Sequence, residues 1–324
     1  MTATAHIPVL LPECLELLQP RVGGIYCDAT VGLGGHAEAL LEASGPDGRL
    51  VGIDRDRAAL AVAGERLARF GDRVTLHHGD LQDVVEILDA LGLLDQPTGG
   101  VDGLLADLGV SSLQLDSAER GFSFQRSGPL DMRMNPDEGE PASAYLASIT
   151  EQELTRVLRR YGEQPRARRV AQAIKRYLAN TAESDTAGLA QVVEAVLPAR
   201  RPGAVHPATR TFMAIRIALN DELGQLERFL ARFMQALAPG ARVAVITFHS
   251  LEDRLVKHRF ARLSQVDPDA PAGLPLTESQ RGRSRAELLT RKPVRAGDAE
   301  LAQNPRARSA KLRGLRYVGA QVAA

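Results

Sequence analysis

The stretch "DATVGLGGH", residues 28–36, carries three glycines and has the composition of a ligand-binding loop. At Gly32, Gly34 and Gly35 a ligand could lie against bare backbone, and glycine also accepts the positive φ angles of tight turns. A helical pattern follows directly, and the N–H groups at a helix N-terminus attract anionic groups. The spacing Gly32-x-Gly34-x-x-Ala37 also satisfies the dinucleotide fingerprint, so the loop by itself fits several nucleotide cofactors.

Acidic residues stand at or just past the ends of four apolar runs that predict strands: Asp28, Asp54, Asp80 and Asp107. Ligands of open α/β sheets bind at the carboxyl ends of the strands. Asp54 is placed to accept hydrogen bonds from adenosine ribose hydroxyls, which NAD, FAD and S-adenosylmethionine share. Four acids disfavour a pyrophosphate but suit a sulfonium cation that carries an amino group. The set favours S-adenosylmethionine, although Asp28 and Asp80 would also serve as helix caps.

Two neighbouring segments fit other parts of that cofactor. Gly34, Gly35 and His36 offer backbone N–H groups and a neutral polar ring, which suit a methionine carboxylate. The segment "HHGDL" places Asp80 and Leu81 where the edge and the face of an adenine would lie. The alternative for His36 is a solvated or capping position in the first turn of the helix.

Short apolar runs alternate with helical patterns over the first part of the chain, which predicts an α/β fold with a doubly wound, mostly parallel sheet. Strand signals stop at residue 113, and a polar loop and several helical runs extend to residue 206. We therefore expect a core of residues 1–112 and 207–324 with an inserted all-helical domain of residues 113–206.

The last part of the chain returns to the α/β pattern. A long helical run, 208–237, and a turn at 238–241 precede the strand "RVAVITF". Ser250 to Asp253 resembles a capping box that opens the next helix. A Pro/Gly/Ser-rich loop follows at 267–285, and the segments 291–294 and 311–318 are expected to form a closing pair of strands.

The composition is that of a globular protein, with 44% hydrophobic and 25% charged residues among 324. No apolar run approaches ~18 residues, and no basic region precedes the first apolar segment, so we expect neither a membrane span nor a secretory signal. Cys14 and Cys27 have no metal-like spacing, which favours a reducing, cytoplasmic setting.

The formal net charge is zero, yet residues 1–155 carry a net −15 and residues 156–324 a net +15. One basic stretch holds eight cations against the single acid Glu163: Arg156, Arg159, Arg160, Arg166, Arg168, Arg169, Lys175 and Arg176. A second candidate patch consists of Arg306, Arg308, Lys311 and Arg313. Such imbalance favours contact with nucleic-acid phosphates, the alternatives being attraction between the two halves or solvated faces.

Seven segments carry a resemblance to a known family: "HIPVLLPECLELL", "DATVGLGGH", "GIDRD", "DLGVSSLQLDSAERGFSFQRSGPLDMRMNP", "HPATRTFMAIRIALNDEL", "ITFHSLEDRLVKHRF" and "NPRARSAKLR". Through them the chain resembles the bacterial 16S rRNA (cytosine-N4)-methyltransferase family along almost its whole length. The resemblance implies a Rossmann-like class I methyltransferase core, S-adenosylmethionine as methyl donor, and a cytidine in the decoding region of small-subunit rRNA as acceptor. The implied partner is 16S rRNA in the small ribosomal subunit, and a homodimer is left open.

The family's cofactor contacts correspond to Gly34, Gly35, His36, Asp54, Leu81, Asp107 and Gln114. Leu81 departs from the aromatic residue that family members can place there, which reduces stacking on an adenine. Asp107 would bind the cofactor or accept the amine proton, and the resemblance favours the first role. Many amino-methyltransferases use a [DNS]-P-P-[aromatic] loop here, but this chain has no such loop, so no catalytic base is assigned.

Several residues keep two interpretations. Phe122 and Phe124 would stack on an extruded base, at roughly 1–3 kcal/mol each, or anchor their loop to the core. Asp131 and Arg133 would clamp the nucleotide or form an internal ion pair. His249 and Ser250 would face the ligand at the end of the strand "RVAVITF", or Ser250 would only cap a helix.

Two other functions compete with this interpretation. An NAD-dependent oxidoreductase is permitted by the glycine spacing. An RNA-binding assembly factor that keeps a nucleotide pocket for stability is permitted by the basic stretch.

Overall fold

The computed structural model describes residues 7–95, 99–198, 206–266 and 284–319. The chain divides into two compact units, Met1–Gly109 with Gln225–Ala324, and Val110–Gly224. Most of the Pro/Gly/Ser-rich loop expected at 267–285 lies outside the described residues. The functional division expected from the sequence, a core of 1–112 and 207–324 and an insert of 113–206, stays a prediction.

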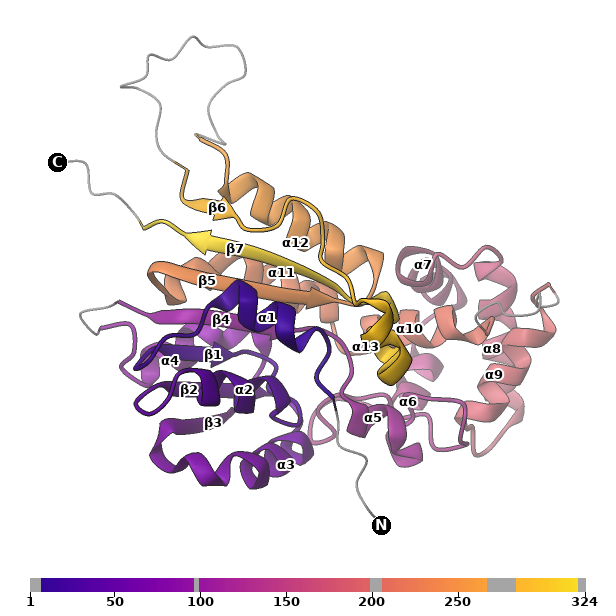
Figure 1. The fold of residues 1–324 in the computed structure, drawn as a ribbon. Coiled ribbons are helices and arrows are strands. Elements are labelled where there is room, and N and C mark those ends of the chain that lie inside the picture. The colour runs from indigo at the N-terminus through magenta and orange to yellow at the C-terminus, as the bar shows by residue number, and fades with distance from the viewer. Residues whose placement is uncertain (1–6, 96–98, 199–205, 267–283, 320–324) are drawn as a thin grey trace, which may run out of the picture. The chain divides into compact units, whose positions relative to one another are not determined.

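The first unit is built on one seven-stranded sheet of order β3-β2-β1-β4-β5-β7-β6 (Figure 1). Five neighbouring strands are parallel: β3 Val74–His78, β2 Arg49–Asp54, β1 Ile25–Asp28, β4 Val101–Asp107 and β5 Leu237–Thr247. The strand β7 (Lys311–Tyr317) runs antiparallel to β5 and to β6 (Ala286–Leu288). The predicted α/β class with a mostly parallel sheet is therefore confirmed.

Helices cover both faces of this sheet (Figure 1): α1 Leu11–Leu18, α2 Gly35–Ala43, α3 Arg57–Leu67, α4 Val84–Ala90, α11 Glu222–Arg232, α12 Ser250–Leu263 and α13 Asp298–Gln303. Alternate strand residues point to opposite faces. Thus Leu104 packs in the cluster that includes α4, α11 and α12, whereas Leu105 packs in the one that includes α1, α2 and α3. The double covering explains why these strands are apolar on both sides.

Four local predictions about secondary structure were wrong. The segment 238–241, expected as a turn, lies inside β5 at a register irregularity opposite Val101 and Gly103. The strand that pairs with β7 on the side away from β5 is 286–288 rather than 291–294, where Pro293 has no N–H to donate. Val294 forms a single bridge to Leu312.

The third concerns the cap of α12. The helix is capped by His249 and not by Ser250, because the His249 ring accepts from the Glu252 N–H and Glu252 accepts from the His249 N–H. Ser250 is the first residue of the helix and is exposed.

The second unit is helical: α5 Ser112–Asp116, α6 Ala142–Ser148, α7 Glu151–Gly162, α8 Ala167–Asn180, α9 Thr186–Ala195 and α10 Ala208–Leu219. It has its own apolar core, to which α7, α8 and α9 contribute Leu154, Leu158, Val170, Ile174, Leu189 and Val193. These residues follow the spacing of an apolar helix face. No described helix in either unit is both long and apolar enough to cross a membrane.

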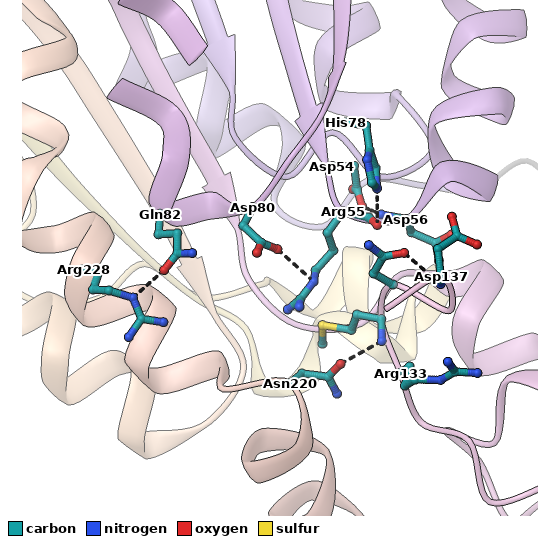
Figure 2. A network of polar contacts seen from close by, with 12 residues as sticks. Asp54, Arg55, Asp56, His78, Asp80, Gln82, Arg133, Asp137, Asn220 and Arg228 are labelled. Atoms are coloured by element: carbon teal, nitrogen blue, oxygen red, sulfur yellow. Dashed lines mark hydrogen bonds and ion pairs between the residues drawn. The ribbon is translucent and has the colours of Figure 1, made fainter. Parts of the chain in front are cut away.

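Asn220 ends α10 and breaks the long helix expected over 208–237. Its side-chain oxygen accepts from the Met134 N–H at 2.8 Å (Figure 2). Its amide nitrogen donates to the carbonyls of Met132 and Arg216. Met132 has a φ of 59°, which is unfavourable for a side chain of this size. Asn220 therefore fixes the strained loop "PLDMRMNP" to the helical unit, and Asp221 continues the chain with a φ of 48°.

We expect Asn220→Ala to destabilise this loop by about 2–3 kcal/mol, because a buried N–H and a buried carbonyl lose their partner. Hydrogen exchange of peptides covering residues 120–140 measures the effect directly. The matched control is Asn180→Ala, since Asn180 also donates to the carbonyl four residues earlier but is exposed. Equal exchange in both variants would show that the loop does not depend on Asn220.

Candidate functional site

The glycine loop between β1 and α2 is held by the backbone of its neighbours. The Ala29 N–H donates to the Leu105 carbonyl in β4, and the Val31 N–H donates to the Ile53 carbonyl in β2. Gly34 is the N-cap residue of α2 with a φ of 79°, and Gly32 has a φ of 51°. Positive φ at both positions explains the choice of glycine without reference to a ligand.

Close packing also requires glycine at one of the three positions, Gly35. A Cβ on Gly35 would lie 2.5 Å from Pro8 Cγ, and one on Gly34 would lie 3.4 Å from the Cα and Cβ of Ala63 in α3. Gly32 differs, since the nearest heavy atom to a Cβ there is the Thr30 carbonyl oxygen at 3.9 Å. The loop surface at Gly32 is therefore open. At Gly34 and Gly35, the lack of a side chain lets the loop pack against α3 and Pro8.

His36 lies in the first turn of α2 and is buried, not solvated. Its Nε2 is 2.9 Å from the Val9 carbonyl oxygen, which can only accept, so Nε2 carries a proton. Its Nδ1 is 3.8 Å from Asp107 Oδ2. The ring is therefore oriented by the segment before α1, and its second nitrogen faces the end of β4.

Asp54 joins the end of β2 to the glycine loop. One carboxylate oxygen accepts from the Gly32 N–H at 2.8 Å and the other accepts from the Asp56 N–H at 2.9 Å. Burial raises the pKa of Asp54 to about 6, although these two hydrogen bonds act in the opposite direction. Each oxygen keeps a further lone pair for a ligand hydroxyl.

Asp28 and Asp107 lie at the ends of the two central strands. Asp28 is only 1% exposed, and burial, with a smaller contribution from the Asp54 charge, raises its pKa to about 7. Burial and the charges of Asp28 and Glu252 raise the pKa of Asp107 well above its usual range. The Asp107 N–H donates to the Thr30 hydroxyl at 2.6 Å. Among the described residues, the buried Asp107 Oδ1 finds no hydrogen-bond partner.

These groups form one acidic site at the carboxyl edge of the sheet. A raised carboxyl pKa means that the surroundings disfavour negative charge, so a cationic ligand would stabilise the ionised forms. The sequence analysis identified Asp28, Asp54 and Asp107 but missed Thr30 and Glu252. Thr30 could have been identified from its position, two residues after Asp28 in the glycine loop.

Asp80 and Leu81 follow β3 at the same edge. Asp80 Oδ1 is 3.1 Å from Arg55 Nε, and the neighbouring Gln82 accepts from Arg228 of α11 (Figure 2). The Asp80 side chain does not cap the helical turn that follows it, so the helix-cap alternative for Asp80 was wrong. Leu81 is half-buried against the core and presents an aliphatic surface. Arg55, which the sequence analysis did not single out, sets the position of the Asp80 carboxylate.

Gln114 belongs to the second unit. It is buried, and its side-chain oxygen accepts from the Ser111 N–H at 3.0 Å in the capping box of α5. Its role toward a cofactor stays a prediction.

Four residues that could have contacted the substrate instead have partners within the protein: Phe122, Phe124, Asp131 and Arg133. Phe122 is buried, and the Phe124 ring lies 4.7 Å from that of His206 and 4.9 Å from that of Phe212. Both rings therefore anchor their loop to the second unit. Asp131 and Arg133 form an ion pair at 2.7 Å.

The two basic patches are smaller than their sequences indicate. Lys175 donates to the carbonyls of Leu146 and Ala147 at the end of α6, at 2.6 and 3.0 Å, and Arg168 lies 3.9 Å from Glu151. Of the C-terminal patch, Lys311 and Arg313 both pair with Asp253. The exposed members are Arg156, Arg159, Arg160, Arg166, Arg168, Arg169, Arg176, Arg306 and Arg308.

We expect Asp28→Asn to stabilise the ligand-free protein increasingly as the pH rises. A folded-state pKa of about 7, above the unfolded value, means that the native state loses stability as the pH rises toward it. Asparagine can still accept from the Thr30 N–H but carries no charge. Between about pH 5 and pH 7 the difference in the free energy of unfolding between Asp28→Asn and the unchanged protein should therefore grow by about 1–2 kcal/mol in favour of the variant.

Chemical denaturation across this pH range measures the difference. Asp89→Asn, which removes an exposed carboxylate of α4, is the control. A constant difference between Asp28→Asn and the unchanged protein at all pH values would contradict the raised pKa.

Nearly the whole sequence matches a protein family and proteins related to it. The match to the MraW methylase family spans residues 3–318. The chain is 52% identical over 314 residues to "Ribosomal RNA small subunit methyltransferase H" of Nitratidesulfovibrio vulgaris, covering 96% of this chain and 85% of that protein. It is 51% identical over 311 residues to the protein of the same name from Anaeromyxobacter dehalogenans, covering 96% and 97%.

Among solved structures, a putative rRNA-methylase from Clostridium thermocellum aligns with a TM-score of 0.44 and 13% identity, over 96% of this chain and 99% of that one. The family match and the two relatives cover nearly the full chain, including the glycine loop and all four strand-end acids. The chain belongs to the MraW methylase family.

Proposed function

We propose that this chain transfers a methyl group from S-adenosylmethionine to the exocyclic N4 of a cytidine in the decoding region of small-subunit rRNA. Membership of a methylase family supports methyl transfer, and the names of the relatives support small-subunit rRNA as acceptor. The observation that supports S-adenosylmethionine as the methyl donor is the acidic site of Asp28, Asp54 and Asp107. The raised pKa values of these residues favour a cationic ligand.

The residues of the acidic site fit the parts of S-adenosylmethionine. The first-turn N–H groups of Gly35 and His36 suit the methionine carboxylate. Asp54 has lone pairs left for the two ribose hydroxyls, and Leu81 offers an aliphatic cover for the adenine face. The unpartnered Oδ1 of Asp107 suits the ammonium group. Gln114 is proposed as a further contact from the family resemblance.

Positioning is the main task of the protein in such a reaction. S-adenosylmethionine, when bound, supplies an electrophilic methyl group on a sulfonium. The cytosine amine is a weak nucleophile because its lone pair is delocalised, so holding it in line can supply up to ~7–11 kcal/mol of the barrier. Asp107 is proposed to orient the donor, and no residue is assigned as the acceptor of the amine proton.

The exposed arginines of α7 and α8 supply positive charge for RNA. Arg156, Arg159 and Arg160 lie on α7, and each is exposed. Phosphate contacts of this kind position RNA without reading its sequence. The substrate implies a cytoplasmic location, and a homodimer stays an alternative.

Methyl transfer from labelled S-adenosylmethionine to small ribosomal subunits tests the proposal. The subunits come from cells that lack this protein, and the label is identified by nucleoside digestion and mass analysis. Label in N4-methylcytidine is expected, and Asp54→Ala should reduce it by roughly 10–150-fold, the equivalent of one hydrogen-bonded charged group. Asp89→Ala, which removes an exposed carboxylate, should leave it unchanged.

Other outcomes separate the alternatives. Label in a different nucleoside would contradict the acceptor, while thermal protection by NAD instead of S-adenosylmethionine would contradict the cofactor. Cofactor binding without label in any small-subunit preparation would favour the assembly-factor alternative.

We also expect S-adenosylmethionine to bind more tightly as the pH rises toward about 7. Its cationic groups favour ionised Asp28 and Asp54, whose pKa values in the ligand-free protein are about 7 and about 6. Binding at about pH 6 should therefore release protons, and affinity should rise by up to about tenfold per pH unit for each proton released.

Calorimetry in two buffers of different ionisation enthalpy measures this release. Asp28→Asn should reduce the number of protons released. Proton uptake on binding would contradict the proposed charge complementarity.

A further inference from the structure

A pocket of about 420 Å³ opens on the second unit between α8 and the end of α9. Three arginines line it, Arg166, Arg169 and Arg176, together with Gln172. Val196 and Leu197, just after α9, complete an apolar wall. All of these residues belong to one compact unit, and we call this feature the arginine pocket.

The sequence places these arginines on one face of α8. Arg169, Gln172 and Arg176 are separated by three and four residues, which aligns their side chains along the helix. The other face of α8 carries Val170 and Ile174 into the core, so the arginine face is turned to solvent. Helix geometry thus concentrates three guanidinium groups around a single concave surface.

Neighbouring acids do not neutralise this charge. Glu151 faces Arg168 and Gln172, and Glu194 at the end of α9 lies 3.6 Å from His206 Nε2. Within the ranges that the structure describes, neither Arg169 nor Arg176 has a carboxylate within ion-pair distance.

Arg166 has a structural task that its neighbours lack. Its Nη1 lies 3.4 Å from the Val196 carbonyl oxygen at the end of α9, where cations stabilise a helix. Arg169 and Arg176 make no such contact with the end of α9. Like charges held together raise the free energy of the pocket, and an anion would lower it.

We propose that the arginine pocket binds one backbone phosphate of the RNA substrate together with the nucleoside attached to it. Guanidinium groups match phosphate oxygens in paired hydrogen bonds. The volume exceeds the needs of a phosphate alone and lies in the usual range for small organic ligands. The wall of Val196 and Leu197 offers an apolar surface to the sugar or base. This inference rests on the proposed function, since it takes RNA as the substrate.

Direct binding of RNA to the arginine pocket is measured with the full chain and a labelled 16S rRNA fragment that covers the decoding region. The Arg169→Gln, Arg176→Gln double variant should weaken binding at least roughly tenfold and reduce the slope of log affinity against log salt by about 1–2. Arg168→Gln is the control, compared per charge removed: it removes one charge from the same helix, outside the pocket. It should change the affinity by less than about threefold.

Steady-state methylation of small ribosomal subunits gives a second readout. The double variant should raise KM for the subunit while kcat and the Kd of S-adenosylmethionine stay unchanged. Arg169→Lys should recover only part of the affinity, because an ammonium group lacks the paired geometry of guanidinium. Cytidine monophosphate should compete with the RNA fragment for the unchanged protein more strongly than inorganic phosphate does.

The results that overturn the proposal are distinct from failure of the proposed function. An equal loss of log affinity per charge removed, in the double variant and in Arg168→Gln, would show diffuse electrostatic attraction. No loss in either variant would show that RNA does not use the pocket. Unchanged RNA affinity with lost binding of a protein of the small subunit would assign the pocket to a protein partner instead. RNA binding that depends on Arg169 and Arg176, without methyl transfer by the unchanged protein, would contradict only the proposed function.

Discussion

Burial of carboxyl groups at the carboxyl edge of the sheet is the constraint on which the α/β unit depends. Parallel strands bring Asp28, Asp54 and Asp107 to the same edge, and the surrounding core removes much of the water that would solvate their charges. Backbone N–H groups offset part of this penalty at Asp54. The part of the desolvation penalty that is not offset raises the pKa values of the carboxyl groups. It also makes the ligand-free site favourable for binding a cation. The family's activity, methyl transfer, is consistent with a donor that carries such a charge.

The same constraint fixes the glycine loop. Because Asp54 accepts from the Gly32 N–H, the path of the loop is tied to the end of β2. Gly34 and Gly35 then bring the loop against α3 and Pro8, and the Val9 carbonyl orients His36. The loop is therefore positioned by contacts within the protein before any ligand arrives, and pre-organisation of this kind reduces the entropy lost on binding.

Sequence patterns predicted the features that depend on local periodicity, and they were less successful where partners lie far apart in the chain. The strand-end acids followed from the alternation of apolar runs, so Asp54 and Asp107 were identifiable. Lys311 and Arg313 looked like a surface patch because the sequence does not show that Asp253 lies beside them. Lys175 caps α6 from α8, and Asn220 stops a helix by bonding to a loop almost ninety residues earlier. Family resemblance supplied the proposed substrate, which no spacing rule indicated.

The sheet order has a consequence for the time course of synthesis. The central strand β4 pairs with β5, and the whole second unit, Val110–Gly224, is translated between them. When β1 to β4 have been synthesised, the edge of β4 that will pair with β5 is therefore unpaired. It stays unpaired until the helical unit and then β5 have been synthesised. The helical unit has a separate apolar core, which lets it fold without β5. Its early folding would leave β5 to cover the β4 edge, and β6 and β7 to complete the sheet after it, so the β4 edge is exposed only in the nascent chain.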